Sequence, residues 1–158
     1  MNLINKISLF LSMIALSIAT LSGSYNVVSR MLDYHLKTNI SSNSFNEIQW
    51  YSFSIIFLLM GGYLVSEDRH IRVDFFYSKL SDRNKNKINI IGYLLFILPF
   101  CLIMIYVSSE YFYRSFCIGE VSPDPNGLCR YFIKAFIPTS FVLILINASF
   151  DFIKRIKY

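Results

Sequence analysis

The stretch INIIGYLLFILPFCLIMIYVSS, residues 88–109, decides the fold, because it contains no charged side chain over a length that can cross a bilayer. An α-helix rises 1.5 Å per residue, so about 20 apolar residues span the hydrocarbon core. Residues 7–29 and 48–66 also carry no charge, and residues 131–150 carry only Lys134, near one end. The sequence therefore predicts an all-α membrane protein with four transmembrane helices.

The composition agrees with this prediction. The chain has 158 residues, of which 54% are hydrophobic and 17% aromatic, and a small soluble domain is less apolar than this. A chain of this length has room for about one domain. We therefore expect a single four-helix membrane domain over residues 1–158, with spans at about residues 7–29, 47–66, 88–109 and 131–152.

The first apolar stretch has to be distinguished from a secretory signal peptide, because Lys6 precedes it. The apolar region of a signal peptide is shorter, roughly 7–15 residues, and ends at a small-residue cleavage site. Here the apolar character continues through Tyr25, Val27 and Val28. An uncleaved first transmembrane helix is therefore favoured.

Lysine and arginine residues predict the orientation, because cytoplasmic loops of membrane proteins are enriched in them. The N-terminus, residues 67–87 and the C-terminal tail share one side and hold ten of the 15 basic residues, whereas the ten acidic residues divide equally between the two sides. We therefore expect both termini to be cytoplasmic. Topology and anionic lipid explain the net charge of +5, and no nucleic-acid partner is expected.

Two patterns bear on helix packing. The first span carries small residues three or four positions apart, which fall on one helix face: Ser8, Ser12, Ala15, Ala19 and Ser22. Small residues let membrane helices approach closely, although serine and alanine are also common in such helices without this role. Gly61 and Gly62, near the end of the second span, indicate a close backbone approach or a bend. The serine- and asparagine-rich residues 30–46 are predicted to form a loop.

Several residues within the spans are candidates for helix contacts or bends. Glu47 opens the second span and is interpreted either as a solvated terminal acid or as a partner at a helix–helix contact. Trp50 lies at the helix mouth, where the headgroup region favours an indole ring. Asn147 lies deep in the fourth span, where we expect its amide to hydrogen-bond another helix. Pro99 and Pro138 predict bends in the third and fourth spans.

The most polar segment, SEDRHIRVDF at residues 66–75, follows the second span. Beyond its charged residues, four apolar residues recur at the spacing of one helix face: Val73, Phe76, Tyr77 and Leu80. This spacing predicts a short amphipathic helix at about residues 71–81. Such a helix would lie along the cytoplasmic membrane surface instead of crossing the bilayer.

The sequence lacks the residues that common membrane enzymes require. Quinone-linked disulfide enzymes need paired redox cysteines, but the three cysteines form no C-x-x-C motif. Cys117 and Cys129 flank a Pro-Asp-Pro-Asn-Gly turn on the predicted periplasmic side, where a structural disulfide can form. Both histidines fall outside the spans, which argues against haem, and no H-E-x-x-H, G-x-S-x-G or phosphate-binding glycine loop is present. We expect no enzyme activity, cofactor or metal.

Three motifs point to one family. An H-[IV]-R-V-D signature closes residues 61–74, GGYLVSEDRHIRVD, just after the second span, and an E-x-x-W motif at residues 47–50 opens that span. Residues 118–128, IGEVSPDPNGL, precede YFIKAFIP at residues 131–138. Together these motifs resemble the small permease subunit (DctQ type) of tripartite ATP-independent periplasmic (TRAP) transporters, over about residues 45–152. The last block is similar to a subgroup often associated with mannitol, chloroaromatic or 2-oxo acid uptake. Cys117 and Cys129 depart from the pattern of this subgroup, in which an aromatic residue and a proline are expected at these two positions.

The resemblance implies a role in a bacterial inner-membrane transporter. In this family a periplasmic solute-binding protein delivers solute to a large elevator-type permease, which moves it with sodium, and a small four-span subunit braces the large one. The implied partners are therefore the large permease, the binding protein and membrane lipid, and the implied substrate is an organic acid or similar small solute. The alternative is a structural or assembly subunit of another membrane complex, without transport.

The resemblance also suggests which residues contact the large subunit. The candidates are the polar cluster after the second span and three residues of the spans: Arg69, His70, Arg72, Asp74, Glu47, Trp50 and Asn147. Arg72 would bind carboxylate or backbone oxygens, and Asp74 would cap the surface helix. The alternative for the cluster is a surface loop that touches only lipid phosphate.

Overall fold

The computed structural model describes residues 3–66 and 81–157, which are almost entirely helical. The elements are α1 (Leu3–Leu36), α2 (Asn43–Ser66), α4 (Asp82–Gly92), the π-helical turn η1 (Tyr93–Ile97), α5 (Leu98–Ile118) and α6 (Arg130–Lys157). Four helical stretches are long and apolar enough to cross a membrane: Leu3–Leu36, Asn43–Val65, Asn84–Ile118 and Arg130–Ile156. The prediction of an all-α protein with four transmembrane helices is confirmed.

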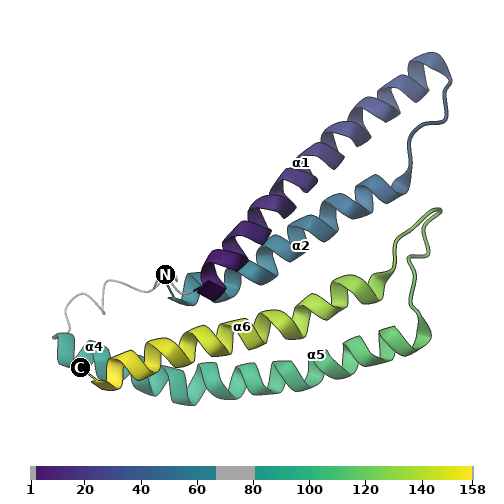
Figure 1. Cartoon of the computed structure of the whole chain (residues 1–158). Coiled ribbons are helices and arrows are strands. Elements are labelled where there is room, and N and C mark those ends of the chain that lie inside the picture. Colours follow the sequence, from purple (N-terminus) through teal and green to yellow (C-terminus); the bar gives the residue numbers. More distant parts are fainter. Residues whose placement is uncertain (1–2, 67–80, 158) are drawn as a thin grey trace.

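The four long helices form an open layer in the order α1, α2, α6, α5 (Figure 1). Both chain termini lie at one end of the layer, and the α1–α2 and α5–α6 connections lie at the other (Figure 1). We call the latter the loop end. Because a helix in a single layer has at most two helix neighbours, only 11–28% of each span is buried inside the protein. The remaining apolar surface must face lipid or another protein.

The small-residue face of α1 packs against α2. All five small residues predicted to share this face are buried, and the Ser8 hydroxyl donates a hydrogen bond to the Leu59 carbonyl of α2 over 2.8 Å. On the same side of α1, a Cβ atom added to Gly23 would lie 2.9 Å from the Gln49 amide nitrogen. The structure therefore favours the packing interpretation of the small residues.

Helices α2 and α6 approach closely at the glycine pair. A Cβ atom added to Gly62 would lie 3.2 Å from the backbone carbonyl carbon of Leu143, and one added to Gly61 would lie 3.3 Å from the Ile144 side chain. The two glycines therefore serve a close helix approach, one of the two roles predicted for them.

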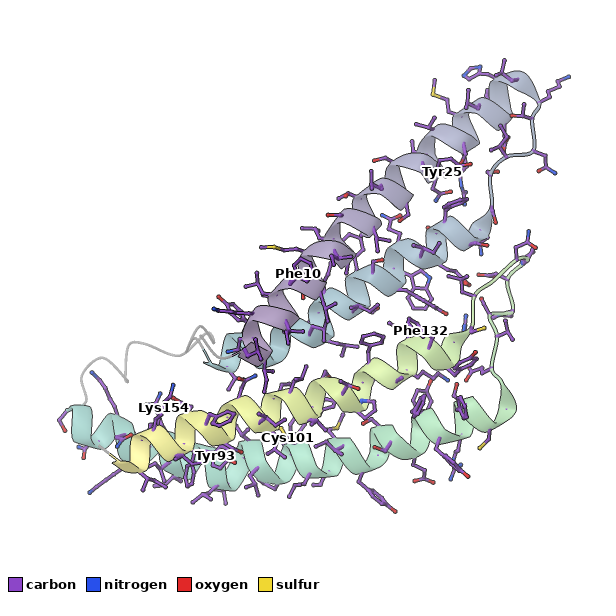
Figure 2. All side chains as sticks on the ribbon, in the orientation of Figure 1. Phe10, Tyr25, Tyr93, Cys101, Phe132 and Lys154 are labelled. Atoms are coloured by element: carbon purple, nitrogen blue, oxygen red, sulfur yellow. The ribbon has the colours of Figure 1, made fainter. Side chains whose placement is uncertain are left out.

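Helix α5 continues from α4 through the π-helical turn, which ends just before Pro99. In a regular α-helix the proline ring would collide with the carbonyl four residues earlier. The turn widens instead, and the Leu98 amide donates to the Tyr93 carbonyl, five residues back. Tyr93 points towards α6 (Figure 2), where its hydroxyl and the Ser149 hydroxyl are 2.8 Å apart.

Two predictions concerned the segments that connect the transmembrane helices. The predicted loop at residues 30–46 is wrong for most of its length, because α1 runs to Leu36 and α2 begins at Asn43. The Asp33 carboxylate accepts hydrogen bonds from the Ile40 and Ser41 amides, both at 2.8 Å, and so fixes a tight connection. The surface helix predicted at residues 71–81 lies outside the described residues, except for Ser81, which precedes α4.

The α1–α2 packing predicts that extra volume at its centre is destabilising. Ala19 is only 1% exposed, so Ala19→Leu should lower the free energy of unfolding by about 1–3 kcal/mol through overpacking. Thermal unfolding in mild detergent, followed by circular dichroism, measures this change. Ser17→Leu adds a similar volume at an exposed position of the same helix and should leave the stability within about 0.5 kcal/mol. Equal effects of the two substitutions would contradict the packing.

Candidate functional site

The structure describes three of the seven candidate interface residues. Glu47 and Trp50 lie in the first turns of α2 and Asn147 lies in α6. The other four, Arg69, His70, Arg72 and Asp74, fall outside the described residues. Their role at the inner loop therefore stays a prediction.

Glu47 is buried at the loop end of the α2–α6 contact, with 2% of its surface exposed. Its Oε2 atom accepts a hydrogen bond of 2.5 Å from the backbone amide of Leu128, in the α5–α6 loop. Its Oε1 atom is buried and has no hydrogen-bond partner among the described residues. The interpretation of Glu47 as a contact residue is therefore favoured over that of a solvated terminal acid, although its partner is a loop backbone and not a helix.

The α5–α6 loop that Glu47 binds has a specific backbone shape. Gly119 ends α5 with a φ of +64°, which glycine adopts without strain, and an isolated antiparallel bridge joins Val121 to Cys129. Inside the turn, a Cβ atom on Gly127 would lie 2.3 Å from the Ser122 Cβ, so no larger residue fits there. The Ser44 hydroxyl, just before Glu47, donates to the Asn126 carbonyl and adds a second link between α2 and the loop.

A charged cluster fixes the base of this loop to α5 and α6. Lys134 forms an ion pair with Glu120 and lies 4.1 Å from the centroid of the Tyr111 ring. The Ser115 hydroxyl donates to the same Glu120 oxygen over 2.6 Å. These hydrogen bonds, from Lys134 first and Ser115 second, lower the pKa of Glu120 below its ordinary value of 4.5.

Beside this cluster lies a cavity of about 650 Å³, lined by residues of α2, α5 and α6 and of the loop. Its charged lining comes from Glu120, Arg130 and Lys134, and Trp50 also lines it. Trp50 is 40% exposed and packs edge-on against Tyr51 with ring centroids 4.3 Å apart. The expected location of Trp50 in the headgroup region stays a prediction.

The expectation that Asn147 bonds another helix is wrong in this structure. Its side-chain amide donates to the Leu143 carbonyl of its own helix over 3.1 Å, while its Oδ1 atom is buried without a hydrogen-bond partner in residues 3–66 and 81–157. The facing residue on α2 is Gly62, where an added Cβ would lie 3.1 Å from the Asn147 amide nitrogen. A glycine offers no side-chain acceptor, so the amide turns back to its own helix.

Cys117 and Cys129 are free, exposed thiols, so the disulfide that the sequence allows is not present in the structure. Each thiol instead interacts with a tyrosine, Cys117 with Tyr113 and Cys129 with Tyr131. No group of three or more metal-ligating side chains occurs in the described part of the chain. The groups that the structure does bring together here are the anchored loop and the charged cluster at its base.

Sequence reasoning missed most of the charged cluster. Lys134 was recognisable as the one charge in residues 131–150, and Arg130 precedes it by one helical turn, on the same face. Glu120 follows Gly119, which ends α5. The pairing of Glu120 with Lys134 had no local signal, because 14 residues and a turn separate them.

The anchored loop lies within the last of the blocks on which the resemblance rested. A family model described as "Tripartite ATP-independent periplasmic transporters, DctQ component" matches residues 9–157, nearly the whole chain. The chain belongs to this family. It is therefore a small membrane subunit of a TRAP transporter, a multi-pass protein of the bacterial inner membrane, and its family is one of transporter components and not of enzymes. Membership implies association with a large permease subunit and a periplasmic binding protein. A comparison with curated proteins finds no match.

The anchoring of the loop by Glu47 makes a prediction for hydrogen exchange. Glu47→Ala leaves the Leu128 amide without its acceptor, which costs about 1–3 kcal/mol. Exchange of this amide should therefore accelerate about tenfold or more. Glu47→Gln, which keeps an acceptor oxygen, should restore most of the protection, and Glu110→Ala, at an exposed ion pair of α5, should have no effect. Unchanged exchange in Glu47→Ala would show that the carboxylate does not hold the loop.

The lowered pKa of Glu120 predicts loss of stability in acid. Above about pH 4.5 the Glu120 carboxylate is ionised in both the folded and the unfolded chain, and its interactions stabilise the fold fully. This stabilisation is lost as the pH falls through the lower pKa of Glu120 in the folded chain. Between about pH 6 and pH 3.5, the thermal midpoint should therefore fall more in the wild type than in Glu120→Gln. Asp124→Asn, in the same loop, is the control and should follow the wild type. Parallel curves for wild type and Glu120→Gln would refute this role.

Proposed function

We propose that this chain braces the large elevator-type permease of its transporter during sodium-coupled uptake of an organic acid or similar small solute, which the periplasmic binding protein delivers. In this proposal the chain contributes a static wall and no part of the solute path. Family membership favours transport over the alternative of an assembly subunit in a different complex. The mannitol, chloroaromatic or 2-oxo acid subgroup stays a prediction from the loop motif.

The open helix layer is the observation that carries this proposal. The layer is one helix thick, and at most 28% of the residues in the apolar stretch of any described span are buried by the chain itself. Large apolar side chains such as Phe57, Leu95 and Tyr106 are 64–79% exposed. Such a surface fits a subunit that lies against a larger membrane protein on one side and lipid on the other.

The distribution of buried charge supports a passive role. Among the residues whose burial the structure describes, Glu47 is the one fully buried charged side chain, and it lies at the loop end of its helix. The other fully buried polar residues of the described spans are serines and asparagines. Ionisable groups near the middle of the membrane mark ion and proton paths, so the described spans offer none of their own.

The polar segment after α2 is proposed to orient the chain on its partner. Arg72 and Asp74 would join the inner loop to the large permease, with both chain termini on the same, cytoplasmic side. The basic excess on that side of the sequence supports this orientation. The anchored α5–α6 loop would then face the periplasm, the side from which the binding protein delivers solute.

Co-purification tests the brace. The tagged chain, co-expressed with its large permease, should recover the permease in mild detergent, and Arg72→Ala or Asp74→Ala should lower this recovery about fivefold or more, because truncating one partner of an interfacial charge pair costs about 2–5 kcal/mol. Lys154→Ala, an exposed charge near the C-terminal end of α6, is the matched control and should not change it. Recovery that is unaffected by both cluster substitutions would exclude the inner loop as the contact, and no recovery from nanodiscs would refute the brace itself.

A further inference from the structure

The cavity beside the charged cluster has two chemically different ends. Towards the loop it is lined by Glu120, Arg130 and Lys134, and further into the spans by aromatic and aliphatic side chains, which include Phe53, Phe57 and Ile137. Phe53 and Phe57 are 50% and 79% exposed, so this apolar end is open to the membrane. Its volume of about 650 Å³ falls within the range of small-molecule sites.

The polar end carries a surplus positive charge. Lys134 is already paired with Glu120. The same carboxylate oxygen also accepts a hydrogen bond from the Ser115 hydroxyl. The Arg130 guanidinium, by contrast, has a buried Nε atom with no hydrogen-bond partner among the described residues. Glu47 does not line the cavity, because its carboxylate is turned to the Leu128 amide. An occupant with one negative charge would therefore complement the lining.

Two further features of this end suit a phosphate group. Helix α6 begins at Arg130, so the positive end of its helix dipole adds to the arginine charge. Arginine binds phosphate oxygens through paired N–H groups. The Trp50 ring, at the same end of the cavity, is of the type that favours the headgroup region of a bilayer.

We propose that this cavity binds an anionic phospholipid from the leaflet at the loop end of the layer. The phosphodiester lies at Arg130 and the first turn of α6, and one acyl chain follows the apolar wall formed by Phe53, Phe57 and Ile137. A free phosphate ion would leave this wall unused, whereas a lipid uses both ends. The site belongs to this chain alone and does not depend on the bracing function.

Native mass spectrometry of the full chain in mild detergent tests the site, with phosphatidylglycerol and phosphatidylcholine as probes. The wild type should retain phosphatidylglycerol in preference to phosphatidylcholine. Arg130→Gln should lower phosphatidylglycerol retention about tenfold, because a hydrogen-bonded charge pair is lost. Ser54→Phe, which fills the apolar end without changing the charge, should also lower it. Helix content by circular dichroism shows that each variant is folded.

Arg114→Gln is the matched control, because Arg114 lies near the same end of α5 in an exposed ion pair with Glu110 and does not line the cavity. It should retain phosphatidylglycerol like the wild type, and excess inorganic phosphate should not displace the lipid. Equal retention of the two lipids, or unchanged retention in Arg130→Gln, would overturn the proposal. The proposal would also be overturned if the wild type retained no phosphatidylglycerol but cross-linked at Trp50 to the large permease. That result would assign the cavity to a protein partner.

Discussion

The close, parallel contact between α2 and α6 is the constraint on which the rest of the structure depends. It joins two helical hairpins that otherwise have no extensive contact. At the loop end it is fixed by the hydrogen bond between the Leu128 amide and Glu47, and towards the other end by Gly62 against Leu143. Glu47 and Gly62 are separated by the same number of residues as Leu128 and Leu143, so the two segments keep one register between these contacts.

Because the two hairpins meet mainly along the α2–α6 contact, much of their apolar surface stays exposed. Each hairpin is stabilised internally, α1 on α2 by small residues and α5 on α6 by aromatic contacts such as Phe100 against Phe141, with ring centroids 5.9 Å apart. Neither hairpin covers the faces of the other, so large apolar side chains remain outside. A membrane supplies no hydrophobic force between helices beyond packing and polar contacts. A broad apolar surface therefore remains outside the contacts that the chain makes with itself.

The four spans and the small-residue face could be predicted from the sequence, because length, charge and helical spacing are local properties. The extension of α1 to Leu36 could not, since it depends on Asp33 accepting backbone amides from the following turn. Glu47 was recognised as a candidate, but its partner is a backbone amide 81 residues away, which no residue pattern encodes. Asn147 was predicted to bond another helix, and the glycine opposite it removes that acceptor.

A cross-link across the α2–α6 contact during transport tests most directly whether the chain is a static brace. An added Cβ on Gly62 lies 3.2 Å from the Leu143 Cβ, close to disulfide geometry. Gly62→Cys and Leu143→Cys, with the three native cysteines replaced, can therefore be oxidised and reduced in the complete transporter in proteoliposomes. The account predicts that solute uptake is the same before and after oxidation. Uptake that stops on oxidation and returns on reduction would show that the two hairpins must move, and would contradict it.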